Sequence, residues 1–245
     1  IKNIGNIWNG ISIVIHLQRM ASFLGFVMTI NINSAEISSK ILISIHRIAQ
    51  RSEQPILVAI DGASGAGKST LASMLEQRTD AVVVPSDDFF AANIPDWEWD
   101  TRSVPERARD VLDWQRLRKE ALELLLENKT AKWHPFDFAA GIRSDGTYGM
   151  SEKYVEKQPA PVIILEGAYS SNPILSDLID FKILIDLPIL ERHQRLDKRE
   201  EDKQFLQRWH ILWDAVEEYY FSEIMPTSSF DLVVTNTGFI ENPNA

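Results

Sequence analysis

The chain contains no cysteine among its 245 residues. Disulfide frameworks, cysteine-ligated zinc, iron–sulfur clusters and thiol nucleophiles are therefore all excluded. A chain without thiols is compatible with a reducing compartment, so we expect a cytoplasmic protein. Glycine and proline are also scarce, with 11 residues each, which excludes a collagen-like or low-complexity chain.

The chain also has few basic residues relative to acidic ones, and it lacks long apolar runs. Lys and Arg number 25 against 35 Asp and Glu, so the formal net charge is −10. Such a chain repels the polyanionic backbone of DNA and RNA, and we expect no nucleic-acid partner. No stretch reaches 18 uninterrupted apolar residues, so we expect neither a membrane-spanning helix nor a membrane partner.

The first 33 residues differ in pattern from the rest of the chain. Residues 7–27 are rich in apolar side chains, but His16, Gln18 and Arg19 interrupt them and no small-residue cleavage site follows. The segment is therefore not typical of a secretory leader. We interpret residues 1–33 as an N-terminal extension. It is either a poorly ordered or over-extended start, or a segment that packs on the surface of one domain over residues 34–245.

From Ser34 onward the pattern alternates between helices and strands. Ile37, Ile41, Ile45 and Ile48 form one stripe and predict an amphipathic helix that ends near Arg51. Short apolar runs typical of buried parallel strands follow at 56–60, 81–84, 162–165, 181–187 and 230–234. Helical patterns cover 105–128 and 188–221, and a loop-rich insertion covers 129–158. The alternation predicts an α/β domain with a doubly wound, mostly parallel sheet.

A glycine-rich segment directly follows the first of these strands. Residues 62–70 read GASGAGKST and match the P-loop pattern G-x-x-x-x-G-K-[ST]. The glycines let successive N–H groups turn toward phosphate oxygens, and the following helix adds its N-terminal dipole. We expect Lys68 to reach the β- and γ-phosphates and the Ser69 hydroxyl to contact Mg²⁺. The predicted nucleotide-binding residues are Gly62, Ala63, Ser64, Gly65, Ala66, Gly67, Lys68, Ser69 and Thr70.

Carboxylates follow two more of the predicted strands. Asp87 and Asp88 come after the second strand, and Glu166 ends the third. Ligands of doubly wound sheets bind beyond the carboxyl ends of the strands, which places these groups beside the P-loop. Asp87 is a candidate general base or Mg²⁺ ligand, and Glu166 is a candidate Mg²⁺ ligand. The alternative for Asp87 and Asp88 is that one of them only caps a helix or turn. The alternative for Glu166 is an ordinary loop carboxylate.

Two further groups of side chains are candidates for the site. Arg192, Arg195 and Arg199 share one helical face and could neutralise a transferring phosphoryl group, with Arg192 and Arg195 as catalytic candidates. The alternative is a solvated helix whose arginines pair with neighbouring acidic residues. Trp97 could stack on a bound acceptor, or it could simply pack within its loop. His193 and His210 have no further ligand at metal spacing, so we assign them no metal.

The chain from Gln54 to Val234 resembles the uridine kinase-like branch of P-loop kinases, which includes relatives of phosphoribulokinase and pantothenate kinase. Four ordered motifs carry the resemblance: GASGAGKST, DDFF at 87–90, FDF at 136–138 and the strand end EG at 166–167. The resemblance implies that Asp87 is the catalytic base and that residues 192–199 belong to a short helical lid. It also implies that ATP and Mg²⁺ are used.

The chain departs from this family where the acceptor binds. Uridine kinases usually carry Tyr where Phe136 stands and His where Gly141 stands, whereas Arg143 matches the family's following arginine. The predicted acceptor-binding residues are Asp87, Trp97, Phe136 and Arg143. We expect an ATP-dependent small-molecule kinase with a uridine- or cytidine-like nucleoside as its leading acceptor. The alternatives are a sugar phosphate or vitamin-like acceptor, or a nucleotide-binding regulator without an acceptor. The sequence does not indicate an oligomeric state.

Overall fold

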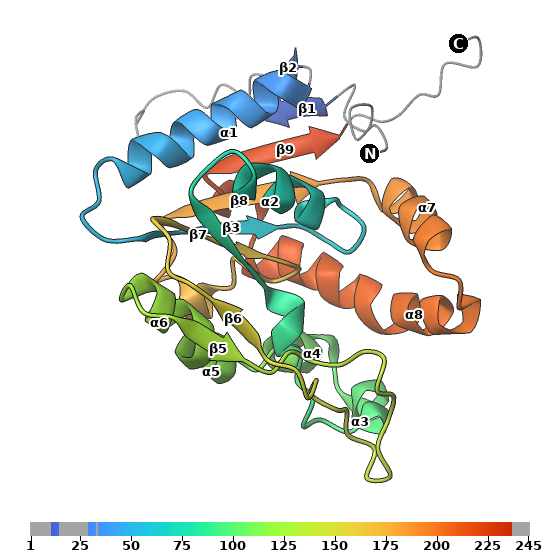
Figure 1. Cartoon of the computed structure of the whole chain (residues 1–245). Coiled ribbons are helices and arrows are strands. Elements are labelled where there is room, and N and C mark those ends of the chain that lie inside the picture. The colour runs from blue at the N-terminus through green and yellow to red at the C-terminus, as the bar shows by residue number, and fades with distance from the viewer. Residues whose placement is uncertain (1–10, 15–28, 33, 237–245) are drawn as a thin grey trace.

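The structure is a computed structural model that describes residues 11–14, 29–32 and 34–236 (Figure 1). The strands are β1 (Ile11–Val14), β2 (Thr29–Ile32), β3 (Ile56–Asp61), β4 (Ala81–Pro85), β5 (Ala131–Trp133), β6 (Val155–Lys157), β7 (Val162–Glu166), β8 (Phe181–Asp186) and β9 (Leu232–Asn236). The helices are α1 (Ser34–Ala49), α2 (Lys68–Glu76), α3 (Asp96–Thr101), α4 (Val104–Asp110), α5 (Trp114–Arg116), α6 (Glu123–Leu126), α7 (Ile189–Arg199) and α8 (Lys203–Tyr219). Short helical turns cover Ser86–Phe89, Leu117–Leu122, Pro173–Leu175, Tyr220–Ile224 and Thr227–Ser229.

The main sheet of the described residues has the strand order β2-β1-β9-β8-β3-β7-β4. Its five strands from β9 to β4 are parallel, and Val58 of β3 lies between Ile164 of β7 and Phe181 of β8. Every residue of β3 is buried, as the continuous apolar run predicts for a central parallel strand. The mostly parallel α/β fold is therefore confirmed.

Helices cover both faces of this sheet. Val58 of β3 packs in one cluster with Ile41 and Ile45 of α1 and Leu71 of α2. Leu57, the residue before Val58 in β3, points to the other face and packs with the helical segment 114–126. The alternation follows from the two-residue period of a strand. Figure 1 shows α1 and α2 on one side of the sheet and α4, α5, α6 and α8 on the other, which makes the fold doubly wound.

The two long helical patterns are each interrupted in the structure. The segment predicted as one helix over 105–128 contains α4, a break at 111–113, and a second helical stretch from Trp114 to Leu126. Asp113 makes the break, because its side chain caps the N–H of Arg116 at 3.0 Å and its own N–H donates to the carbonyl of Phe89 at 2.8 Å. Similarly, Asp202 caps the start of α8 and separates it from α7.

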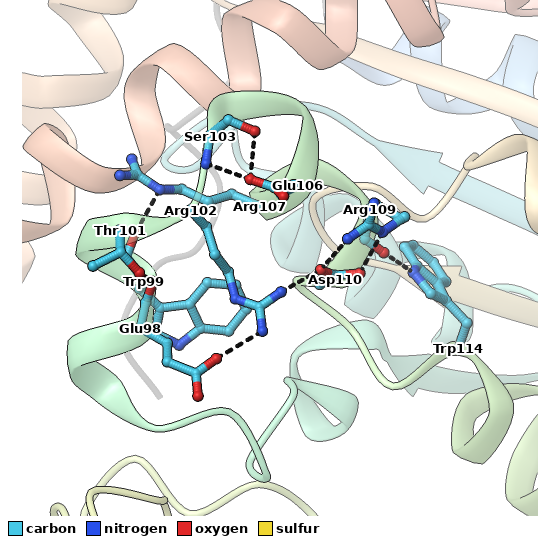
Figure 2. A network of polar contacts seen from close by, with 10 residues as sticks. All are labelled: Glu98, Trp99, Thr101, Arg102, Ser103, Glu106, Arg107, Arg109, Asp110 and Trp114. Carbon is cyan, nitrogen blue, oxygen red and sulfur yellow. Dashed lines mark hydrogen bonds and ion pairs between the residues drawn. The ribbon is translucent and has the colours of Figure 1, made fainter.

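Arginines tie α3, α4 and α8 together, and Figure 2 shows the contacts between α3 and α4. Arg102 follows α3 and pairs with Asp110 at the end of α4. The Nε of Arg107 in α4 donates to the carbonyl of Trp99 at 2.8 Å, and its Nη1 donates to the carbonyl of Leu212 in α8 at 3.0 Å. These bonds satisfy backbone carbonyls in the half-buried region between the helices and fix the position of α8 relative to α3 and α4.

Two strands of the N-terminal extension lie at one edge of the sheet. β1 pairs antiparallel with β9, and β2 pairs antiparallel with β1. Residues 1–10, 15–28 and 33 lie outside the described residues, so the interpretation of segment 1–33 stays a prediction apart from these two strands. The insertion 129–158 contains a short hairpin of β5 and β6. No helix in the described part of the chain is long and apolar enough to cross a membrane.

Candidate active site

The P-loop lies between the end of β3 and the start of α2. Its backbone takes conformations that favour glycine, with φ of 82° at Gly65 and 102° at Gly67, the N-cap of α2. A Cβ added to Gly65 would also meet the carbonyl oxygen of Arg192 at 2.8 Å. The glycine spacing read from the sequence therefore has a steric reason in the structure.

A buried ion pair between Arg192 and Glu217 holds the P-loop from the protein interior. The backbone N–H of Ser64 donates to Oε1 of Glu217 at 2.7 Å, and Nη1 of Arg192 donates to the carbonyl of Ser64 at 3.1 Å. The same Nη1 donates to Oε2 of Glu217 at 2.9 Å. Arg192 is 7% exposed and Glu217 is 2% exposed. Both polar backbone groups of Ser64 are thus fixed by side chains from α7 and α8.

This placement differs from the expectation for Arg192. The sequence suggested a lid arginine that faces the transferring phosphoryl group, but Arg192 is buried beneath the P-loop and is not among the residues that line the cavity. Its guanidinium is engaged by Glu217 and Ser64. The three arginines that share this helical face therefore differ in role, because Arg192 supports the P-loop from the protein interior instead of facing the cavity.

A second buried group joins the P-loop to the loop after β7. Oδ1 of Asp61 accepts the N–H of Gly62 at 2.8 Å and of Tyr169 at 3.0 Å. Its Oδ2 accepts the N–H of Ser171 and the hydroxyl of Tyr220, both at 2.8 Å. Burial raises the pKa of Asp61 to about 6, although these hydrogen bonds act in the opposite direction. No role for Asp61 could be predicted from the sequence, since three of its four partners are more than 100 residues away.

One cavity of about 1040 Å³ opens in front of the P-loop. Lys68, Ser69, Asp87 and Glu166 all line it. The Ser69 hydroxyl donates to Oε2 of Glu166 at 3.1 Å, and Nζ of Lys68 donates to the carbonyl of Ala63 at 3.1 Å. The structure therefore brings together the side chains that the sequence placed at the ends of three different elements.

The electrostatics of this group suit a divalent cation. Burial raises the pKa of Glu166, the negative charge of Asp87 raises it further, and Lys68 lowers it. Two carboxylates that repel one another gain from a cation between them, and carboxylate and hydroxyl oxygens are ligands that Mg²⁺ prefers. The first turn of α2 has no side-chain cap, and its residues 68–70 line the cavity. Its N–H groups can therefore serve a phosphate. The residues present fit Mg²⁺ and a nucleotide phosphate.

The neighbouring carboxylates Asp87 and Asp88 lie in different surroundings. Both belong to the short helical turn Ser86–Phe89 after β4. Asp87 is exposed and lines the cavity. Oδ2 of Asp88 instead accepts the indole N–H of Trp133 at 2.8 Å, and burial raises the pKa of Asp88. Asp88 thus satisfies a buried tryptophan, whereas Asp87 is available for a ligand.

The later part of α7 supplies cations to the cavity. Arg195 and Arg199 line it together with Lys198. Nη1 of Arg195 donates to the carbonyl of Ala66 in the P-loop at 3.4 Å, and burial lowers the pKa of its guanidinium without removing its charge. Arg195 therefore lies where the sequence predicted a lid arginine, next to the nucleotide-binding loop.

The acceptor contacts predicted from the sequence are mostly elsewhere. Trp97 is 60% exposed, and neither Trp97 nor Arg143 is among the cavity-lining residues. Phe136 is buried behind Phe138, whose ring lies 4.5 Å away between centroids. Of the four predicted acceptor-binding residues, only Asp87 lines the cavity.

Several aromatic residues that the sequence analysis did not assign to the site also line the cavity. Trp209 and Trp213 of α8 line it, with Phe90, Phe138 and Tyr169 from other elements. The i, i+4 spacing of the tryptophans is typical of a core stripe. Trp213 is indeed buried, but a side chain that belongs to the core can also form the wall of a cavity. The spacing alone does not distinguish the two.

A P-loop after a central parallel strand, with carboxylates at the ends of the next two strands along the sheet, defines a P-loop phosphotransferase fold. Residues 41–130 match the family model described as Zeta toxin. Over 191 residues the chain is 30% identical to the uridine kinase of Borrelia turicatae, which covers 74% of this chain and 87% of that protein. The uridine kinase of Lactobacillus johnsonii is 28% identical over 204 residues, or 77% of this chain and 90% of the relative. The chain belongs to the uridine kinase family of P-loop kinases.

A solved structure supports the same fold. The structure of a possible uridine kinase from Bacillus stearothermophilus superimposes with a TM-score of 0.53. The superposition covers 79% of this chain and 98% of that chain at 18% sequence identity. At this identity the likeness concerns the fold, and the acceptor has to be argued from the site itself.

Proposed function

We propose that this protein is an ATP- and Mg²⁺-dependent kinase that transfers the γ-phosphoryl group to a hydroxyl of a small molecule. The observation that carries the proposal is that Lys68, Asp87 and Glu166 line one cavity with the P-loop. Phosphoryl transfer depends mainly on positioning and on neutralisation of charge, and this cavity offers residues for both. The relatives named uridine kinase support the same class of reaction.

Each side chain has a role that follows from its position. Asp87, which is exposed at the cavity wall, would accept the proton of the acceptor hydroxyl. Lys68 and Arg195 lie on the P-loop side and would stabilise the negative charge of the transferred group. Ser69 and Glu166 would hold Mg²⁺, which, when bound, neutralises phosphate charge.

A uridine- or cytidine-like nucleoside is the leading acceptor. Its support is the 30% identity to a uridine kinase over most of the chain and the aromatic rings that line the acceptor end of the cavity. A flat pyrimidine can stack on such rings in an offset or edge-to-face arrangement. The cavity is also large enough for a nucleoside next to a nucleotide, since ligand sites commonly span roughly 300–1,000 Å³.

One observation favours a second acceptor class. Phe136 stands where family members usually carry Tyr, and the walls near it are mainly apolar, with Phe90, Phe138, Trp209 and Trp213. Arg143, which would suit a phosphate or carboxylate, is not among the cavity-lining residues. The polar edge of a pyrimidine therefore finds fewer partners than in a typical uridine kinase. A hydroxylated, largely apolar vitamin-like molecule suits these walls better than a sugar phosphate does.

The test is an acceptor screen with the full chain and Mg·ATP. Uridine, cytidine, a sugar phosphate, pantothenate and a hydroxylated pyridine are offered separately, and both ADP and phosphorylated acceptor are measured by mass spectrometry. A phosphorylated acceptor that disappears in Lys68→Ala supports the proposal. ADP formation that is independent of every acceptor would instead indicate a nucleotide-hydrolysing regulator and overturn it.

A further inference from the structure

We infer that α7 and α8 form a binding site for one transition-metal ion of the Zn²⁺ type, separate from the Mg²⁺ ligands of the cavity. The candidate ligands are His193 of α7 and His210 and Asp214 of α8, and one ligand atom from each of them lies within 4.8 Å of the other two. From the sequence these histidines are assigned no metal, because His193 and His210 are 17 residues apart and meet only when the two helices pack.

The geometry of the three groups is close to that of a metal site. Nε2 of His193 lies 2.9 Å from Oδ2 of Asp214, and Nδ1 of His210 lies 3.2 Å from Oδ1 of the same carboxylate. Tetrahedral Zn²⁺ with ligands at 2.0–2.1 Å keeps its ligand atoms about 3.3 Å apart. The rings of His193 and His210 already have centroids 3.8 Å apart. The three ligand atoms lie within 4.8 Å of one another, so binding requires the side chains to move from this spacing to the one around a single ion.

One of these atoms lacks a hydrogen-bond partner. Nε2 of His193 is buried and has no hydrogen bond within the described part of the chain, although Asp214 lies close to it. The approach of the carboxylate is therefore not aligned with an N–H at this nitrogen. Buried polar atoms without a partner are rare, and a bound ion is one explanation for them. A metal bound to the free lone pair of Nε2 would satisfy this atom.

The donor set indicates the kind of ion. Two imidazole nitrogens and one carboxylate oxygen suit Zn²⁺, Co²⁺, Ni²⁺ or Cu²⁺, whereas Mg²⁺ prefers oxygen ligands alone. All three side chains are partly exposed, so a water molecule can complete the coordination. The chain has no cysteine that would compete for such an ion. The site is thus chemically distinct from the group of Ser69 and Glu166.

The position of the site connects it to the P-loop without sharing residues with the cavity. His193 follows Arg192, which bonds Ser64, and His210 follows Trp209, which lines the cavity. None of the three proposed ligands is among the cavity-lining residues. An ion held here would join α7 to α8 beside the break at 200–202. It would thereby fix the helix that carries Arg195 relative to the helix that carries Glu217.

The experiment is a Co²⁺ titration of the untagged full-length chain, followed by displacement with Zn²⁺. To prevent Co²⁺ binding at the Mg²⁺ ligands of the cavity, the chain carries Glu166→Gln and excess Mg²⁺ is present. We expect intense visible bands of tetrahedral Co²⁺ that saturate at one ion per chain. Adding His193→Ala or His210→Ala should abolish the bands. Asp214→Asn should weaken binding by at least about tenfold, the lower end of what even loss of an outer partner costs.

The matched control is His46→Ala, because His46 is exposed on α1 and bonds only Gln50 among the described residues. This variant should bind Co²⁺ as the parent does. Zn²⁺ at about 100 times its Kd should also raise the Tm of the parent by roughly 5–10 °C, and should not raise that of the His193→Ala variant. Octahedral spectra, non-saturating binding, or full binding by the His193→Ala and His210→Ala variants would overturn the proposal.

Discussion

Asp87 and Asp88 are adjacent in the sequence, and the structure predicts opposite consequences for their removal. Asp87→Asn keeps the size of the side chain but removes the proposed base. Asp87 is exposed and no hydrogen bond of its side chain occurs within the described residues, so the free energy of unfolding should hardly change. We expect kcat to fall by roughly 10²–10⁴, the usual contribution of general-base catalysis, with little change in the affinity for ATP.

Asp88→Ala should do the reverse. The indole N–H of Trp133 donates to Asp88, and Trp133 is only 1% exposed, so the alanine leaves a buried donor without its partner. An unsatisfied buried donor costs about 1–3 kcal/mol. At about 2–4 °C per kcal/mol for a domain of this size, the Tm should fall by roughly 2–12 °C. The value of kcat, measured well below the Tm, should stay within a few fold of the parent.

The two variants are compared by steady-state kinetics with the best acceptor and by thermal unfolding with and without ATP. Each variant serves as the control of the other, because the substitutions are one residue apart and both remove one negative charge. Normal turnover in Asp87→Asn together with a large loss in Asp88→Ala at full stability would show that the wrong carboxylate was assigned as the base.

Four other outcomes are expected. Lys68→Ala should abolish phosphoryl transfer and leave the Tm unchanged, as measured by product formation and calorimetry. Glu217→Ala leaves Arg192 buried without its partner and should destabilise the fold by about 3–5 kcal/mol in urea unfolding. Burial raises the pKa of Asp61 from 3.8 to about 6, so the folded state retains a proton that the unfolded state releases. As pH rises from 4 to above 6, the parent should therefore lose up to about 3 kcal/mol of stability relative to Asp61→Asn. Uridine should show a KM raised roughly tenfold to several hundredfold over a typical uridine kinase, because two hydrogen bonds are missing, each worth on the order of 1 kcal/mol when neutral and more when charge-assisted; micromolar KM with fast turnover would refute this.

The parts of the fold that depend on local sequence could be predicted. The continuous apolar run of β3 and the glycine spacing of residues 62–67 are both set by neighbours in the chain, and the structure contains both as expected. The breaks in the long helices could not be predicted with the same ease. The break at Asp113 requires the carbonyl of Phe89, which lies 24 residues earlier in the chain. No local pattern contains that partner.

The arginines of α7 show a similar limit at the site. Arg192, Arg195 and Arg199 look equivalent on a helical face, yet Arg192 supports Ser64 from the interior and the other two line the cavity. What separates them is Glu217, which is 25 residues from Arg192 in the chain and adjacent to it in space. Helical spacing indicates which residues share a face. It does not indicate which part of that face another helix will cover.

Helix α8 connects the two ends of the cavity, and this makes its residues the most informative ones to vary. Near its C-terminus Glu217 binds the N–H of Ser64, and the Tyr220 hydroxyl just beyond it binds Asp61 at the base of the P-loop. One and two turns earlier, Trp213 and Trp209 line the same cavity, in the part proposed for the acceptor. A rigid helix transmits a displacement at one end to the other. An acceptor that displaces the tryptophans would therefore also displace the groups that hold the P-loop, and the affinities for acceptor and nucleotide would be coupled through this helix.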